Sequence, residues 1–326
     1  MDDRFMNQLR QDPDPGFSRS LRAKLLTQEI PRAVKPALAS ALSGAIALVV
    51  VVSLFAFPSV RASAQAMLDL FRVKKFSALP FDQSRIDKLQ QLDKDRMFMV
   101  FDKTETIREP GPPQVVGSLS AASSAAGFHV ASPGFLPAGL TADTIRVDGA
   151  GEAKVSVSAS KLRALLDALD LDDVQVPDGI DGKEIQVRKA PVVIQEFHGG
   201  STGKLRAAVL QSNSPEIGVP AGIDVPKLAE IGLRILGLDQ SQAHHIATTT
   251  DWRTTLLVPV PLNASTFRQV TVRGQQGLMI TTASKDASGD QRRAGTIVLW
   301  SEGDKVFATT GNLDNKDMLQ MAESVQ

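Results

Sequence analysis

The feature that most constrains this chain is an uncharged run of 21 residues from Ala37 to Phe57, ALASALSGAIALVVVVSLFAF. A helix rises about 1.5 Å per residue, so this length matches the roughly 30 Å hydrocarbon core of a bilayer. Cleaved signal peptides have shorter apolar cores, of about 7–15 residues, close to the N-terminus. A cleavage-like Ala62-Ser63-Ala64 follows the run, but 36 residues precede it, which favours a retained anchor. The sequence therefore predicts one membrane span over residues 37–57.

The charges beside the run predict its orientation. On the N-terminal side a single acid, Glu29, stands among five bases, which are Arg19, Arg22, Lys24, Arg32 and Lys35. The side of a span that is richer in Lys and Arg tends to stay in the cytoplasm, whereas a long polar domain is translocated regardless of its charge. We expect a single-pass protein of the cytoplasmic membrane, with a cytoplasmic N-terminus and an extracytoplasmic C-terminal domain.

The chain then divides into four parts. Residues 1–36 form a cytoplasmic tail and residues 37–57 the span. Residues 58–116 are expected to hold juxtamembrane helices and a linker. Residues 117–326 form the extracytoplasmic domain, and a division of this domain into two lobes near residues 212–225 stays open.

The tail carries an amphipathic pattern after the turn at Asp12-Pro13-Asp14-Pro15-Gly16. Phe17, Leu21 and Leu25 fall on one face of a helix, and basic side chains lie elsewhere on it. One interpretation is a helix that docks on a cytosolic partner through these three residues. The other is a basic helix that lies on the inner leaflet of the lipid bilayer. The two interpretations do not exclude each other.

The juxtamembrane part also shows helical spacing. A helix is predicted over residues 61–76, followed by a second short helix over 84–92 and a strand over 97–101. The apolar side chains that carry the first pattern are Ala64, Met67, Leu68 and Phe71. Consecutive prolines in Glu109-Pro110-Gly111-Pro112-Pro113 exclude helix and ladder alike, so we expect a loop there.

The remainder alternates between short helices and strands, which predicts the α+β class, with an antiparallel sheet flanked by helices. The helices are expected from Ser118 or Ser120 to Gly127, around Leu162 to Leu169, from Pro226, around Ala243 to Ile246, and after a cap at Asp314 or Asn315. The strands are expected over residues 155–157, 185–187, 192–197, 205–211, 254–260, 267–272, 277–281, 296–301 and 305–310.

The composition and the motifs exclude several kinds of chemistry. The chain has no Cys and a formal net charge of zero, which rules out thiolate sites and argues against a nucleic-acid partner. The segment Gly199–Gly203 fits G-x-S-x-G, but it lies between two predicted strands, so we expect a hairpin rather than a nucleophile elbow. Gly203-Lys204 lacks the other residues of a P-loop. We expect no enzyme and no cofactor.

Metal chemistry is not expected either. His244 and His245 are adjacent, whereas ligands on one helix face need a spacing of four residues. The carboxylates between Asp167 and Asp181 lack the glycine-centred loop of a calcium site and are typical of a solvated helix end. Trp252 and Trp300 are candidates for lining a ligand cleft, although each lies beside a strand pattern, where a core position is the more ordinary role.

Several stretches resemble bacterial anti-sigma-factor-like, single-span membrane proteins that carry an extracytoplasmic domain of unknown function. The C-terminal ones are VTVRGQQGLMI (270–280), IVLWSEGDKVFATTG (297–311) and the closing Met321-Ala322-Glu323-Ser324-Val325. PGFLPAGL (133–140), RASAQAMLDLFRVKKF (61–76) and QDPDPGFSRSLRAKL (11–25) look similar to the same group. Zinc-type anti-sigma domains carry a His and two Cys in the cytosolic part, which this cysteine-free chain cannot match. The resemblance implies a sensing or regulatory role.

Two functions from different classes follow from these expectations. The first is a bitopic regulator whose outer domain binds an envelope protein or ligand and whose tail contacts a sigma factor or another cytosolic regulator. The alternative is a membrane-anchored extracytoplasmic carrier or chaperone-like module that binds an apolar ligand without a signalling role. An apolar cleft in the outer domain would favour the second function.

Overall fold

A computed structural model describes residues 69–71, 73–81, 84, 101–137, 139–199, 204–220, 222–261, 265–285 and 291–326. The predicted tail helix with Phe17, Leu21 and Leu25 and the predicted span over residues 37–57 lie outside these ranges. Among the residues that the structure does describe, no helix is both long enough and apolar enough to cross a membrane.

The described chain has the mixed α+β class that the sequence predicts, with mostly antiparallel sheets and short helices. The helices are α6 (Leu119–Ala126), α7 (Ala159–Ala168), α8 (Val225–Ile235), α9 (Gln240–Thr249) and α10 (Asn315–Glu323). The first ten strands are β1 (Asp69–Phe71), β2 (Lys75–Phe81), β3 (Phe101–Arg108), β4 (Gln114–Val116), β5 (Leu140–Asp148), β6 (Gly151–Val157), β7 (Glu184–Lys189), β8 (Val192–Gly199), β9 (Leu205–Asn213) and β10 (Glu216–Val219). The last five are β11 (Thr255–Pro261), β12 (Ser265–Val272), β13 (Gln275–Lys285), β14 (Gln291–Glu302) and β15 (Lys305–Gly311).

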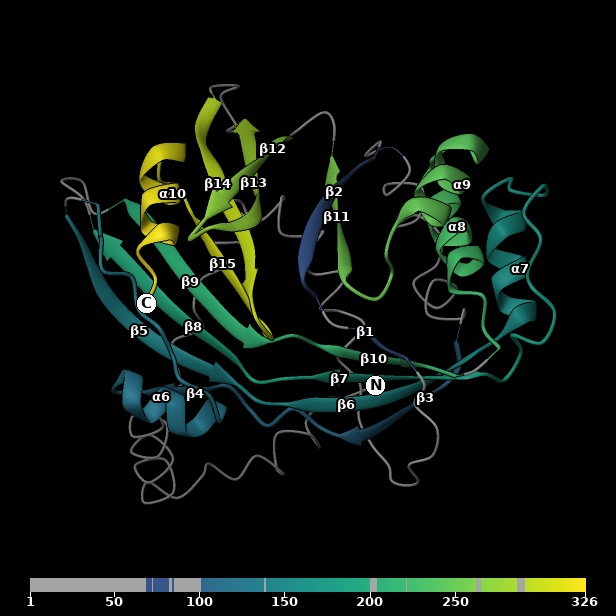
Figure 1. Cartoon of the computed structure of the whole chain (residues 1–326), viewed down its shortest axis with the longest axis horizontal. Coiled ribbons are helices and arrows are strands. Elements are labelled where there is room, and N and C mark those ends of the chain that lie inside the picture. The colour runs from purple at the N-terminus through teal and green to yellow at the C-terminus, as the bar shows by residue number, and fades with distance from the viewer. Residues whose placement is uncertain are drawn as a thin grey trace, which may run out of the picture. The chain divides into compact units, whose positions relative to one another are not determined.

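Four long stretches of chain run through two sheets and form a shared platform (Figure 1). Each stretch is one strand of the eight-stranded sheet joined to one strand of the five-stranded sheet: β4 with β3, β5 with β6, β8 with β7, and β9 with β10. The register is the same on both sides of the junction between the two central stretches, because Asp148 pairs with Val192 and Gly151 pairs with Lys189. The two sheets are therefore one antiparallel layer that is interrupted along a line.

Proline and glycine occupy that line in every stretch. The interruptions fall at residues 109–113 (EPGPP), 149–150 with Gly151 following, Ala190-Pro191, and Ser214-Pro215. Proline has no N–H to donate to a ladder, which explains the lapse in the three stretches that contain it, whereas the second stretch has glycine at this level. The close approach also requires glycine, because a Cβ on Gly149 would lie 3.1 Å from the backbone N of Gly111.

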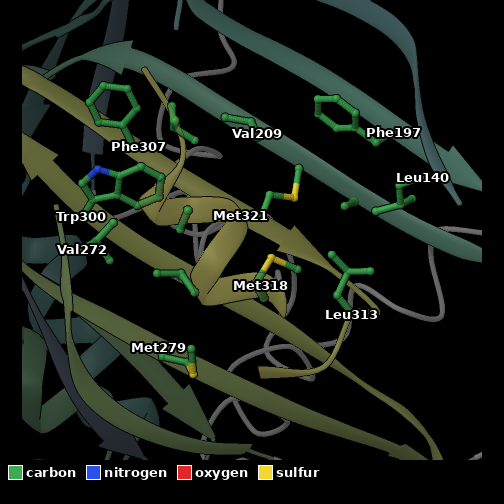
Figure 2. Packing of buried hydrophobic residues seen from close by; sticks show 14 residues of the cluster. Leu140, Phe197, Val209, Val272, Met279, Trp300, Phe307, Leu313, Met318 and Met321 are labelled. Carbon is green, nitrogen blue, oxygen red and sulfur yellow. The ribbon is translucent and has the colours of Figure 1, made fainter. Parts of the chain in front are cut away.

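Beyond β9 the eight-stranded sheet continues through β15, β14 and β13 to β12, and α10 covers one face of it. Trp300 and Phe307 stack with their ring centroids 5.1 Å apart, and Met318 and Met321 of α10 belong to the same buried cluster (Figure 2). Trp300 is fully buried. This cluster is the largest apolar core of the described residues.

Strands β2 and β11 pack on the opposite face of β13 and β14. Met279 belongs to the core under α10, whereas its neighbours Leu278 and Ile280 pack with β2 and β11, as alternation along a strand requires. β2 and β11 pair in parallel with each other only. Pro259 and Pro261 alternate along β11 and cannot donate to a further strand, which suits a two-stranded sheet.

A buried polar contact ties the segment between α6 and β5 to the platform. The carbonyl oxygen of Ala131 accepts hydrogen bonds from the side-chain amides of Gln195 and Gln211, each at 2.6 Å, and the Ala131 N–H donates to Gln211 Oε1 at 2.8 Å. Both glutamines are almost completely buried. The contact therefore satisfies polar groups that would otherwise be costly inside the core.

The predicted helix starts are confirmed by their caps. Ser118 Oγ accepts from the Ala121 N–H, and the carboxylates of Asp224 and Asp314 accept from the N–H three residues later. Gly127 ends α6 with φ of 75°, the left-handed conformation that glycine favours.

The expectation of a helix over residues 61–76 is wrong where the structure describes that segment. Residues 69–71 form β1, which pairs with β10, and residues 75–81 form β2, which pairs with β11. Of the strand expected over 97–101, only Phe101 is among the described residues, and it begins β3. Tertiary pairing with distant strands thus overrides the local helical spacing.

A glycine on β15 provides a test of this packing. A Cβ at Gly311 would lie 2.2 Å from the carbonyl oxygen of Arg206, which belongs to the neighbouring backbone and cannot rotate away. We expect Gly311→Ala to lower the free energy of unfolding by about 2–4 kcal/mol. The control Gly232→Ala, on α8 with open space around it, should raise it by about 0.5–1 kcal/mol. Urea denaturation followed by tryptophan fluorescence measures both, and unchanged stability of Gly311→Ala would contradict the packing.

Candidate functional site

Four charged side chains form a row across four neighbouring strands beside the interrupted line. Arg108 on β3 lies opposite Glu152 on β6, Glu152 lies opposite Arg188 on β7, and Arg188 lies opposite Glu216 on β10. The signs alternate across the sheet, so each inner member has opposite charges on both sides. Cross-strand pairs of opposite charge stabilise a sheet, which accounts for the row as a structural element.

Arg188 is the centre of the row. Its Nε lies 3.0 Å from Glu152 Oε1, and its Nη1 lies 3.5 Å from Glu216 Oε2. The hydrogen bond that it donates to Glu152 raises the pKa of its guanidinium, although burial opposes this shift. Gln186 Nε2 also donates to Glu152 Oε1. Arg188 and Glu152 are therefore held in fixed positions by each other and by their neighbours.

A hollow of about 450 Å³ opens where this row meets the interruption of the strands. The four charged residues line it together with Lys189 and backbone or side-chain atoms of residues 150–151, 190 and 213–214. Ser214 is already engaged, because its Oγ accepts from the Val73 N–H at 2.6 Å and its own N–H donates to the Asp304 carbonyl. The floor of the hollow is therefore anchored by contacts with other parts of the fold.

Two cations at this hollow carry no ion pair within the described residues. Arg108 is exposed, Lys189 is half-buried, and neither lies within ion-pair distance of a described carboxylate. Asn213, which is half-buried, also lines it. Three basic and two acidic residues line the hollow, which leaves an excess of one positive charge. This excess of positive charge suits a carboxylate or another oxygen-rich anionic group.

Neither tryptophan that the sequence singled out lines this hollow. Trp300 lies in the core under α10, and its Nε1–H donates to Glu302 Oε1 at 3.2 Å. Trp252 packs with α9 and donates from Nε1 to the Ala247 carbonyl at 2.7 Å. Their role in a ligand cleft stays a prediction, and the position of Trp300 is the ordinary core position that the sequence left open.

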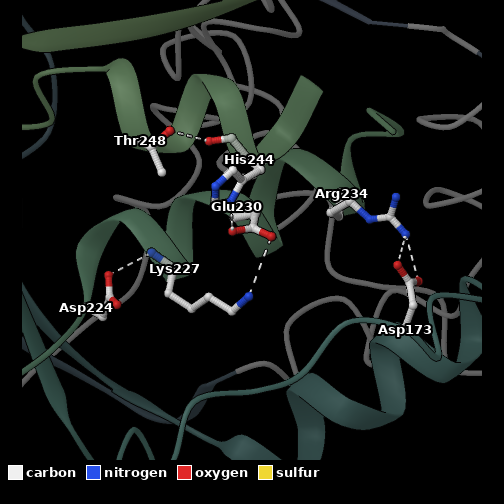
Figure 3. Close-up of polar contacts among 7 residues, drawn as sticks. All are labelled: Asp173, Asp224, Lys227, Glu230, Arg234, His244 and Thr248. Atoms are coloured by element: carbon white, nitrogen blue, oxygen red, sulfur yellow. Dashed lines mark hydrogen bonds and ion pairs between the residues drawn. The ribbon is translucent and has the colours of Figure 1, made fainter. Parts of the chain in front are cut away.

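The histidine pair lies on α9, above α8 (Figure 3). His244 Nδ1 lies 3.2 Å from Glu230 Oε2, and Lys227 Nζ lies 3.5 Å from the other oxygen of the same carboxylate. Both histidines are exposed. Over the described ranges, no group of three or more His, Cys, Asp or Glu side chains has the arrangement of a metal site.

The carboxylates between Asp167 and Asp181 do not converge on one point. Asp173 holds Arg234 of α8 through contacts of 2.7 and 2.6 Å, as Figure 3 shows. Asp181 Oδ1 accepts from the Ala159 N–H at the start of α7, beside a smaller hollow of about 230 Å³ that Arg163 and Asp178 also line. Two of these acids thus have structural roles.

The strands that flank the Gly199–Gly203 motif pair with each other as a hairpin, as the sequence predicts, while residues 200–203 lie outside the described residues. β8 ends at Gly199, β9 begins at Leu205, and the two strands pair in antiparallel register from Val192 opposite Ser212 to Gly199 opposite Leu205. A nucleophile elbow requires a turn from a strand into a helix. Because a strand follows this segment, the structure gives no support to a hydrolase site there.

The charged row is the functional feature that the sequence did not predict. Its members are far apart in the chain and meet only through strand register. One signal was present, since each long stretch carries Pro or Gly near the same level: 110–113, 149–151, Pro191 and Pro215. Such residues in the middle of strand patterns mark an interruption, where backbone groups and side chains become available to a ligand.

The central arginine has a measurable structural role. We expect Arg188→Leu to lower the free energy of unfolding by about 1–2 kcal/mol, because Glu152 is mostly buried and loses its partner. Arg108→Leu, which removes a charge without an ion pair, should change it by less than about 0.5 kcal/mol. In a double-mutant cycle measured by urea denaturation, Glu152→Leu should restore part of the stability of Arg188→Leu. Simple additivity of the two substitutions would count against the pairing.

The chain was also compared with models of known protein families, with curated proteins and with solved structures, and none of the three comparisons finds a match. The resemblance to anti-sigma-factor-like membrane proteins therefore stays a prediction from the sequence.

Proposed function

We propose that this chain is a membrane-anchored, non-catalytic regulatory protein whose extracytoplasmic domain binds an acidic group of an envelope protein or peptide in the hollow beside Arg108, Glu152, Arg188 and Glu216. The observation that carries the proposal is the pair of cations, Arg108 and Lys189, that line the hollow and have no ion pair with another described residue. A partly enclosed cation without a partner favours an anionic ligand, which would replace the water around both charges.

The geometry supports binding rather than catalysis. Arg188 is held by two carboxylates, so it keeps the other charges in place and is not free to move. The two central stretches keep one register across the interruption, which favours a preorganised site. A ligand carboxylate would contact Arg108 and Lys189 and keep away from Glu152 and Glu216. Specificity for one acidic group would follow from this mixture of attraction and repulsion.

The membrane part of the proposal rests on the sequence. The uncharged run over residues 37–57 would anchor the domain, and the helix with Phe17, Leu21 and Leu25 would contact a sigma factor or another cytosolic regulator. The amphipathic face of that helix is the kind of surface that a groove on a partner binds. Ligand binding outside the membrane would then be linked to a contact inside the cell.

The alternative, an extracytoplasmic carrier for apolar ligands, requires an apolar groove. Both hollows described above are lined mainly by charged and polar residues, and the apolar clusters are packed by side chains from opposing elements. An acidic ligand therefore agrees better with the described part of the domain than an apolar one does.

Binding can be tested with a fluorescent polyglutamate peptide and the full chain in lipid nanodiscs. We expect the peptide to bind more weakly as salt is raised, because exposed charges are screened. The double variant Arg108→Ala/Lys189→Ala should lose binding by about tenfold or more, which corresponds to about 1.4 kcal/mol. The matched control Lys204→Ala/Arg206→Ala removes the same two residue types from exposed positions just before β9 and on it, and should bind as the parent does. Equal affinity of both double variants would refute the site.

The predicted topology can be tested by labelling, because the chain has no cysteine of its own. In intact cells a membrane-impermeant maleimide should label the Lys316→Cys variant, whose position on α10 is exposed. The Ser18→Cys variant should be labelled only after the cells are permeabilised. Labelling of Ser18→Cys from outside would reject both the cytoplasmic tail and a cytosolic partner for it.

A further inference from the structure

Among the described residues, one edge of the eight-stranded sheet has no strand beside it. β12 is the last strand in the order of that sheet, and its described partner is β13. Residues 266–269 are all exposed, so both faces of the strand are open there. Phe267 is 41% exposed, and among the described residues Val115 is the other large apolar side chain with so much exposed surface. An open edge of this length presents unpaired N–H and C=O groups to another strand.

The other edges of the described sheets have features that limit pairing, and β12 lacks them. β1 and β4 are three residues long, and prolines precede β4. β3 is longer, but its register shifts at two places and it carries the charges Lys103, Glu105 and Arg108. β12 has eight residues in unbroken register with β13, and it contains no Pro, Gly, Lys or acidic residue. Natural edge strands usually carry such protection.

The single charge on β12 does not protect the edge. Arg268 Nη2 lies 3.4 Å from Met279 Sδ, so the guanidinium lies over its own sheet, above β13. A charged side chain that prevents pairing at an edge strand would point away from the sheet, toward an approaching strand. The backbone of β12 is therefore open to a partner whose side chains do not need to neutralise a charge at the edge.

We infer that β12 pairs in antiparallel register with β12 of a second copy of this chain, across a two-fold axis at Gln269. Residues that lie directly opposite each other in antiparallel strands point to the same face of the sheet. A two-fold axis meets this condition only if it relates one residue to its own copy, for example Gln269 to Gln269 or Arg268 to Arg268. Centring on Arg268 would oppose two arginines, which is unfavourable. Centring on Gln269 opposes two amides, each of which donates and accepts.

The strand is self-complementary in this register. Phe267 of each copy lies opposite Thr271 of the other, and Arg268 lies opposite Val270, so both kinds of pair occur twice. Pairs of an aromatic and a β-branched side chain are among the favourable cross-strand combinations. Pairing would also cover the exposed ring of Phe267. Because β12 forms these favourable side-chain pairs with an antiparallel copy of itself, we choose a second copy of this chain as its partner.

Disulfide formation tests the register in the full, otherwise cysteine-free chain. In the inferred dimer the two Gln269 residues face each other with Cα atoms about 4.5–5.5 Å apart, which lies within the range for a disulfide. We expect Gln269→Cys in native membranes to form, on mild oxidation, a product of twice the chain mass of 34.9 kDa. The matched control Gln276→Cys, exposed on β13 opposite Thr271, should form none.

Two further arms establish the register and identify the partner. Phe267→Cys and Thr271→Cys should cross-link when the two variants are mixed and much less when each is present alone. Gln269→Lys and Gln269→Glu should each remain monomeric by sedimentation, and their mixture should recover the dimer, which also shows that both variants are folded. A cross-link from Gln269→Cys to a different protein, or equal cross-linking of Gln269→Cys and Gln276→Cys, would overturn the inference. None of these outcomes depends on peptide binding at the hollow.

Discussion

The interruption of strand pairing along a line of prolines and glycines determines how the rest of this domain is arranged. Four antiparallel stretches cross that line, and Pro191 and Pro215 remove donors from two of them in the middle of the platform. Between the two central stretches the register does not change across the interruption, because Asp148 opposite Val192 and Gly151 opposite Lys189 belong to one continuous alignment. Between the first two stretches it shifts by one residue, from Gln114 opposite Val147 to Arg108 opposite Glu152. The layer therefore divides into two sheets whose central strands stay aligned.

The charged row and the hollow follow from this arrangement. Where the ladder lapses, backbone groups and neighbouring side chains border a space instead of another strand. Arg188 is fixed at this border by Glu152 and Glu216, and Arg108 and Lys189, which have no ion pair among the described residues, also line the hollow. Exposed ion pairs contribute little to stability on average. The row is therefore better explained by the fixed positions that it gives to its side chains than by its contribution to the free energy of folding. Order is also what a preorganised binding site requires.

Much of the fold could be predicted because its signals are local. Ser118, Asp224 and Asp314 are helix caps whose side chains bond to the backbone three residues away, and the strand patterns after Asp251 match β11 to β15. The helix predicted around Phe71 is wrong, because the apolar residues there have helical spacing while pairing with β10 and β11 makes the segment two strands. The site could not be predicted for a related reason. Arg108, Glu152, Arg188 and Glu216 come together only through the register of four strands, and sequence alone does not determine register.

The parallel pair of β2 and β11 has a consequence for how the chain reaches this structure. β2 is made early, and its only strand partner follows after most of the domain has been synthesised. Contacts between such distant segments form slowly, because a long loop must close before they are gained. Until then Phe76 and Leu79, which are buried in the finished domain, have to be kept from other apolar surfaces. We expect β2 to be the last strand to reach its final position. A nascent chain that ends before Pro261 would therefore need a chaperone to keep β2 from aggregating.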